Sequence, residues 1–104
     1  MHFSDAHYDI LYQEGSTVDC DTGYSSYCCR STTETGHGSR KAGKFGALNS
    51  HCDVPPITVQ AVLDKVKSMN GDYLFWTGDS TPHDEATTNA AEVFQTMVAI
   101  SEMV

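Results

Sequence analysis

Four side chains that can bind a metal ion or carry a proton lie in two short segments of the sequence. Asp5 and His7 stand one residue apart near the start, and Asp79 and His83 follow an apolar run at residues 73–77. Carboxylate and imidazole groups together suit Zn²⁺, Mn²⁺ or iron. Asp5, His7 and Asp79 are therefore candidate metal ligands. One bridging aspartate can hold two ions about 3.5 to 4 Å apart, a spacing that suits phosphoryl chemistry.

Two parallel strands would bring these residues together. Residues 73–77 are bulky and mostly apolar and lie between glycines, which predicts a short strand buried on both faces. Residues 1–4 predict the carboxyl-terminal half of a second strand. Ligands bind beyond the carboxyl ends of parallel strands, so the residues that follow both strands would converge there. The alternative is that Asp79 and Asp84 only cap the next helix.

Two helices are predicted from apolar spacing. Residues 57–69 carry one apolar face, Pro56 suits the first turn, and Asn70-Gly71 suits the end. Residues 88–103 are rich in alanine and carry a broad apolar stripe. The order of strand, crossover, helix and strand predicts one parallel βαβ unit, with a further helix after it.

Residues 13–53 form a polar segment without periodicity, which predicts a long loop. The segment contains all four cysteines, which are Cys20, Cys28, Cys29 and Cys52. Their spacing lacks a Cys-x-x-Cys pair, which argues against a zinc finger or ribbon. An even number of clustered cysteines suggests two disulfides and an oxidising compartment. Each bridge would stabilise the folded loop by about 2 to 4 kcal/mol.

Length and charge restrict the class of protein. The chain has 104 residues, enough for one small domain, and its net charge of −8 disfavours nucleic acids and anionic membranes as general partners. It has no apolar run of about 18 residues for a transmembrane helix, and its first residues lack a signal peptide. Two strands leave sheet edges uncovered, so we expect residues 1–104 to be the opening part of a larger α/β domain.

Several motifs, taken in order, resemble the acid sphingomyelinase family of calcineurin-like metallophosphoesterases. They are Ser4-Asp5-Ala6-His7-Tyr8-Asp9, Leu11-Tyr12, Cys20, Cys28-Cys29-Arg30, Gly43-Lys44-Phe45-Gly46, Cys52-Asp53-Val54-Pro55 and Phe75-Trp76-Thr77-Gly78-Asp79-Ser80-Thr81-Pro82-His83-Asp84. The Asp-x-His and Gly-Asp motifs indicate only the superfamily, whereas the vicinal cysteines and the last motif are more specific. The resemblance covers nearly the whole chain.

The resemblance implies a zinc-dependent phosphodiesterase, secreted or lysosomal, that hydrolyses a phosphodiester by metal-bound hydroxide. The substrate would be sphingomyelin or a nucleotide-type ester. Asp5 and His7 would bind the first of two zinc ions, Asp79 would bridge both, and His83 would protonate the leaving group. The fold implied is the incomplete amino-terminal part of a metallophosphoesterase sandwich. The family's Gly-Asn-His-Glu motif and His-x-His pair are absent from this chain.

The resemblance also implies the disulfide pairing, Cys20 with Cys28 and Cys29 with Cys52. A bond between the vicinal cysteines would need a strained ring, so pairing outward is also the physical choice. Two other interpretations stay open. One is a catalytically inactive, disulfide-stapled secreted module or a truncated gene product. The other is a purple-acid-phosphatase type of site, which expects a tyrosine where this chain has Pro82.

Overall fold

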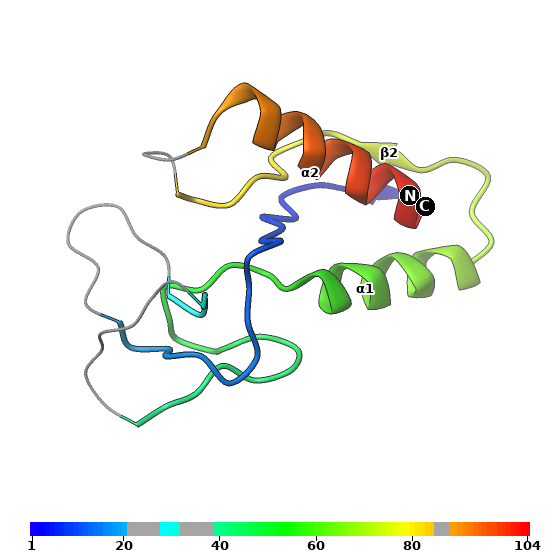
Figure 1. The fold of residues 1–104 in the computed structure, drawn as a ribbon. Coiled ribbons are helices and arrows are strands. Elements are labelled where there is room, and N and C mark those ends of the chain that lie inside the picture. Colours follow the sequence, from blue (N-terminus) through cyan, green and yellow to red (C-terminus); the bar gives the residue numbers. More distant parts are fainter. Residues whose placement is uncertain (21–27, 32–38, 85–87) are drawn as a thin grey trace.

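A computed structural model describes residues 1–20, 28–31, 39–84 and 88–104. Its elements are β1 (His2–Phe3), α1 (Pro56–Ser68), β2 (Phe75–Trp76) and α2 (Ala90–Met103), arranged as in Figure 1. The strands pair in parallel, His2 opposite Phe75 and Phe3 opposite Trp76. The predicted α/β class, the parallel pair, the crossover helix and the following helix are thus confirmed.

Both strands are shorter than predicted, but the two segments stay side by side beyond them. The amide of Asp5 donates to the carbonyl of Gly78 at 3.0 Å, and the amide of Tyr8 donates to the carbonyl of Ser80 at 2.8 Å. A longer bond of 3.4 Å joins the amide of His7 to the carbonyl of Asp79. These bonds keep the segment after β1 beside the segment after β2.

The prediction that residues 73–77 are buried on both faces is wrong. Tyr73 is 74% exposed and Phe75 is 64% exposed, whereas Trp76 is half-buried against the core. Successive strand residues point to opposite faces of a sheet. In the described residues, Phe3 and Trp76 pack against the core cluster, and the opposite face of β2 is open to solvent.

Each helix begins and ends with local signals in the sequence. Pro56 is the first residue of α1, where the missing amide hydrogen costs no hydrogen bond of the helix. Asn70, just beyond the helix, has a positive φ of 51°. Helix α2 begins at a capping box in which Asn89 and Glu92 exchange side-chain and backbone hydrogen bonds. The cap of α2 is therefore Asn89, and the alternative that Asp79 or Asp84 caps this helix is wrong.

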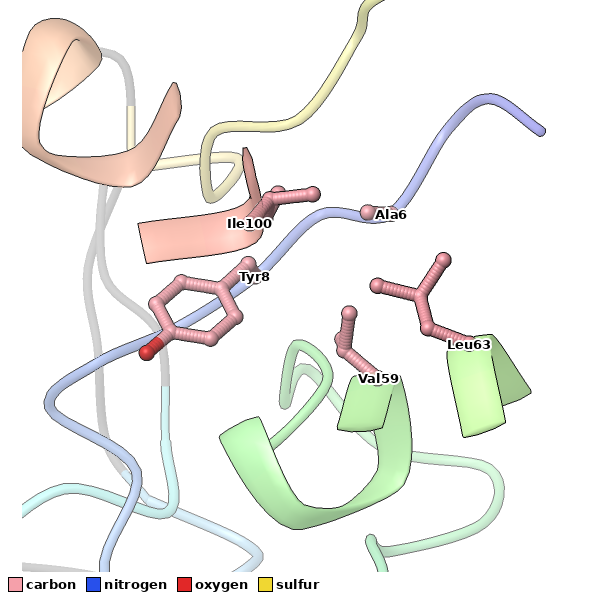
Figure 2. Packing of buried hydrophobic residues seen from close by; sticks show 5 residues of the cluster. All are labelled: Ala6, Tyr8, Val59, Leu63 and Ile100. Carbon is pink, nitrogen blue, oxygen red and sulfur yellow. The ribbon is translucent and has the colours of Figure 1, made fainter. Parts of the chain in front are cut away.

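One core joins the helices to the segment that follows β1. Val59 and Leu63 of α1, Ile100 of α2, and Ala6 and Tyr8 are all buried and lie close together (Figure 2). Ala6 and Tyr8 flank His7 in the sequence. Their burial therefore anchors the backbone on both sides of that histidine.

The apolar stripe of α2 is only partly used by this core. Ile100 is fully buried, whereas Phe94 and Met97 are exposed. The stripe predicted from the sequence is thus partly buried and partly exposed in the structure. No helix in the described residues is long and apolar enough to cross a membrane.

The cysteine loop forms a second, smaller cluster around Val18, Cys29 and Ala42. Disulfides join Cys20 to Cys28 and Cys29 to Cys52, which is the pairing that the resemblance implies. Short backbone bridges such as Thr17 with Lys41 connect the described parts of the loop. Residues 21–27 and 32–38 of the predicted loop lie outside the described residues.

Candidate metal and phosphoester site

The three predicted metal ligands lie together. One ligand atom from each of Asp5, His7 and Asp79 can be chosen so that all lie within 4.8 Å of one another. His7 Nε2 is 3.6 Å from Asp79 Oδ2, and the Asp79 side chain is 62% exposed. An imidazole and two carboxylates in this proximity form a donor set that suits Zn²⁺ or Mn²⁺.

The backbone at all three positions adopts an uncommon conformation. Asp5, His7 and Asp79 have φ values of 54°, 41° and 53°, and they are three of the six described non-glycine residues with positive φ. Such residues cost free energy and are concentrated at functional sites in proteins. The turns redirect the chain at the ends of β1 and β2, and the hydrogen bonds between the two segments hold the turned residues side by side.

Hydrogen bonds orient the side chains around the site. His7 Nδ1 lies 3.0 Å from the carbonyl oxygen of Thr81, so the proton of the neutral ring is assigned to Nδ1. That leaves the Nε2 lone pair directed toward Asp79, which is the usual arrangement of a metal-binding histidine. The indole of Trp76 donates to the hydroxyl of Ser80 at 2.9 Å and supports the residue after Asp79.

The pKa of the Asp5 carboxyl is shifted in favour of its ionised form. The hydroxyl of Ser4 donates a hydrogen bond to Asp5 and is the main cause that holds the pKa of the Asp5 carboxyl below its ordinary value. Desolvation opposes this effect, whereas Asp79 and the neighbouring His7 add to it. A carboxylate that remains ionised is available as a metal ligand without first losing a proton.

His83 lies beside the metal ligands and is held by a carboxylate that the sequence interpretation had not singled out. Its ring stacks on that of His7 with 3.8 Å between centroids. Its Nδ1 donates to Asp53 Oδ1 at 2.6 Å, and its backbone amide donates to Asp53 Oδ2 at 2.8 Å. Asp53 is buried, whereas the His83 side chain is 50% exposed.

The same residues offer a second metal-like grouping, which the hydrogen bonds argue against. Ligand atoms of His7, Asp53 and His83 also lie within 4.8 Å of one another. However, Asp53 already accepts two hydrogen bonds from His83, and His7 Nδ1 already bonds to Thr81. The contacts therefore favour a hydrogen-bonded pair of Asp53 and His83 over a second metal site. Asp5, His7 and Asp79 remain the candidate metal ligands.

A buried ion-pair cluster lies next to His83. Arg30 Nε donates to Asp9 Oδ2 at 2.8 Å, and Arg30 Nη1 donates to Asp84 Oδ2 at 2.9 Å. Burial disfavours the charge of Arg30, but the hydrogen bonds and charges of Asp9 and Asp84 outweigh it and raise its pKa. Sequence spacing gave no signal for this cluster, because its members lie 21 and 54 residues apart.

Comparison with known proteins finds relatives that are similar to this chain in sequence. The chain is 31% identical over 107 residues to sphingomyelin phosphodiesterase B of Dictyostelium discoideum, covering 94% of this chain and 16% of that protein. It is 30% identical over 112 residues to an endopolyphosphatase of Candida glabrata, covering 100% of this chain and 15% of that protein. It is 31% identical over 85 residues to the sphingomyelin phosphodiesterase of Homo sapiens, covering 81% of this chain and 13% of that protein.

No protein-family model matches the chain. The chain spans about one sixth or less of the length of these relatives. The similarity nevertheless extends over most of the chain, and it includes both segments that supply the clustered aspartates and histidines. The chain is therefore a homologue of the sphingomyelin phosphodiesterases and endopolyphosphatases of the metallophosphoesterase family, which confirms the resemblance seen in its sequence.

Proposed function

We propose that this chain is the amino-terminal part of the catalytic domain of a metal-dependent phosphodiesterase. The observation that carries the proposal is the convergence of Asp5, His7 and Asp79, with His83 stacked on His7. The homology to sphingomyelin phosphodiesterases supports a phosphodiester substrate. The two disulfides support an oxidising compartment, secreted or lysosomal.

Zinc is the metal that the family resemblance implies, and the donor set is compatible with it. Asp5 and His7 would hold the first ion, and Asp79, which lies against His7, would be shared with a second. Three ligands do not complete two coordination shells, so residues beyond this chain would supply the rest. Bound metal would polarise a phosphoryl oxygen and lower the pKa of a water molecule that attacks phosphorus.

His83 would act on the leaving group. Its Nδ1 proton is engaged by Asp53, so as a general acid the doubly protonated ring would give up the proton on Nε2 and return to the Nδ1-protonated form. Asp53 accepts one hydrogen bond from the His83 ring and one from the His83 backbone amide, which fixes the orientation of the imidazole. The stack of His83 on His7 supports this role, because a phosphoryl group held by metal at His7 would lie near the His83 ring.

A second candidate substrate has a specific basis in the comparisons. Endopolyphosphatase relatives match as much of the chain as sphingomyelin phosphodiesterases do. Cleavage of a phosphoanhydride needs the same metal ligands, but its leaving group is a phosphate and needs less help from an acid such as His83. A strong dependence on His83 would therefore favour a phosphodiester with an alcohol leaving group.

Metal binding by the chain itself gives the first test. Titration calorimetry with Zn²⁺ should show binding that Asp79→Asn weakens by at least about 100-fold, because removing a ligand should cost no less than removing a residue that only supports one. Asp72→Asn changes an exposed aspartate before β2 and should leave the affinity unchanged. Equal affinities in the two variants would overturn the metal assignment and favour the inactive, disulfide-stapled module.

Hydrolysis by the full-length gene product gives the second test. A chromogenic phosphodiester and a polyphosphate chain should be compared, each with the natural protein and with His83→Ala. Loss of about 100-fold or more in phosphodiester turnover is expected, because general acids contribute that much to such reactions. Unchanged turnover in the variant would remove His83 from this role.

A further inference from the structure

We propose that the Cys29–Cys52 disulfide and Arg30 form a positioning clamp for His83. The proposal rests on the proposed catalytic role of that histidine and concerns how the fold holds it. The clamp consists of the disulfide, the two residues that directly follow its cysteines, and the His83-Asp84 dipeptide that those residues grip. Its members come from three separated segments of the chain.

One side of the clamp is Asp53. This residue follows Cys52 directly, is buried, and uses both carboxylate oxygens to accept hydrogen bonds from His83. Its neighbour Val54 is fixed in turn, because its amide donates to the carbonyl of His7 at 3.1 Å and its carbonyl accepts from the amide of Asp9 at 2.9 Å. Asp53 is therefore held against the segment that carries the metal ligands.

The other side of the clamp is Arg30. This residue follows Cys29 directly, is buried, and donates to Asp84, the residue after His83. It also donates to Asp9, so one guanidinium ties the His83-Asp84 dipeptide to the segment after β1. The planar guanidinium offers several donors in a fixed fork, which a lysine ammonium lacks.

The disulfide joins the two sides. Cys29 is fully buried, and its amide donates to the carbonyl of Thr17 at 2.9 Å. Its φ is 65°, so the chain turns directly before Arg30. The bond to Cys52 brings the Cα atoms of these cysteines to 5.6 Å. Two adjacent residues, His83 and Asp84, are thus gripped by the residues that follow the two ends of one disulfide.

The loop contains matched controls for both kinds of contact. The second disulfide, Cys20–Cys28, shares the vicinal cysteine pair with the first. The second arginine ion pair joins Arg40 to Asp19, the residue before Cys20, at the protein surface. Removing either control group tests general effects of losing a disulfide or an arginine fork in the same loop.

Side-chain ¹⁵N NMR of the histidines tests the clamp without metal or substrate. In the natural chain, His83 should show the Nδ1-protonated tautomer and a ring contact with His7. In Cys29→Ser/Cys52→Ser, both signals should be lost and His83 should show the tautomer mixture of a solvated histidine. Cys20→Ser/Cys28→Ser should keep both signals. A folded Cys29→Ser/Cys52→Ser protein with unchanged His83 signals, or equal loss in both double variants, would overturn the proposal.

Arg30→Lys keeps the test decisive if the first double variant does not fold. The lysine retains the buried positive charge but not the fork, so the His83 ring contact should weaken, whereas Arg40→Lys should leave it intact. Identical His83 signals in the two lysine variants would refute the clamp. A failed hydrolysis or zinc assay would count against the proposed function alone, since these NMR signals need neither.

Discussion

The two ends of the candidate site are held in different ways. At the metal end, Asp5, His7 and Asp79 are placed by turns in the backbone and by hydrogen bonds between the segments after β1 and β2. At the histidine end, His83 is placed by a buried carboxylate 30 residues away in the sequence. Backbone turns and backbone hydrogen bonds fix the first group, whereas side-chain contacts fix the second.

This difference teaches how each end should fail. A backbone turn persists as long as the strands pair, so the metal end depends mainly on the folded core behind it. A side chain held by buried polar partners loses its position when one partner is removed, even in a folded protein. Variants that disturb only one end of the site test this difference directly. Variants that disturb both ends identify the part of the structure on which both depend.

The largest effect is expected in the shared core. Leu63→Ala should lower the free energy of unfolding by about 2 to 5 kcal/mol, because it leaves a cavity in the core that anchors Ala6 and Tyr8. Val62→Ala, at a neighbouring position that is 46% exposed, should change stability by less than about 0.5 kcal/mol. Denaturant unfolding followed by fluorescence measures both. Loss of zinc binding and loss of the His7–His83 ring contact at different denaturant concentrations would contradict a shared core.

A smaller effect is expected at the metal end alone. Ser80→Ala removes the acceptor of the Trp76 indole and should cost about 1 kcal/mol of stability. It should also weaken zinc binding, since Ser80 follows Asp79, while the His83–Asp53 contact is retained. Ser101→Ala removes an exposed hydroxyl that bonds within α2 and serves as the control. Loss of the His83 signals in the first variant would show that the two ends are not separable.

The smallest effect is expected outside both ends, at the Asp19–Arg40 pair. Hydrogen bonds from Arg40 hold the pKa of the Asp19 carboxyl below its ordinary value, against a smaller effect of desolvation. A depressed pKa in the folded state means that this stabilisation is present above the unfolded-state pKa of about 3.9 and is lost as pH falls through the lower folded value. Because the pair is exposed, the contribution is small.

Thermal unfolding of the natural chain and Asp19→Asn at several pH values measures this contribution. The difference in midpoint temperature should be small near neutral pH and should disappear in strongly acidic solution. A difference that grows as the pH falls would contradict the sign of the pKa change. Neither zinc binding nor the His83 ring contact should differ between the two proteins near neutral pH.

Much of the scaffold was predictable because its signals are local. Helix α1 follows from apolar spacing between a proline and an Asn-Gly pair, and the parallel strands follow from the crossover that this helix makes. The exposure of Tyr73 and Phe75 was not predictable from the apolar run. An apolar sequence shows that a strand can be covered on both faces, but not which segments cover it.

The sequence by itself determined which residue types stand at the ends of the two strands, and its motifs indicated the family. Only the tertiary structure decided that Asp53 grips His83 and that Arg30 joins Asp9 to Asp84. The physical reason is the path of the cysteine loop. An aperiodic loop carries no repeating pattern from which its course can be inferred, so contacts between residues 21 to 54 positions apart appear only when the chain is folded.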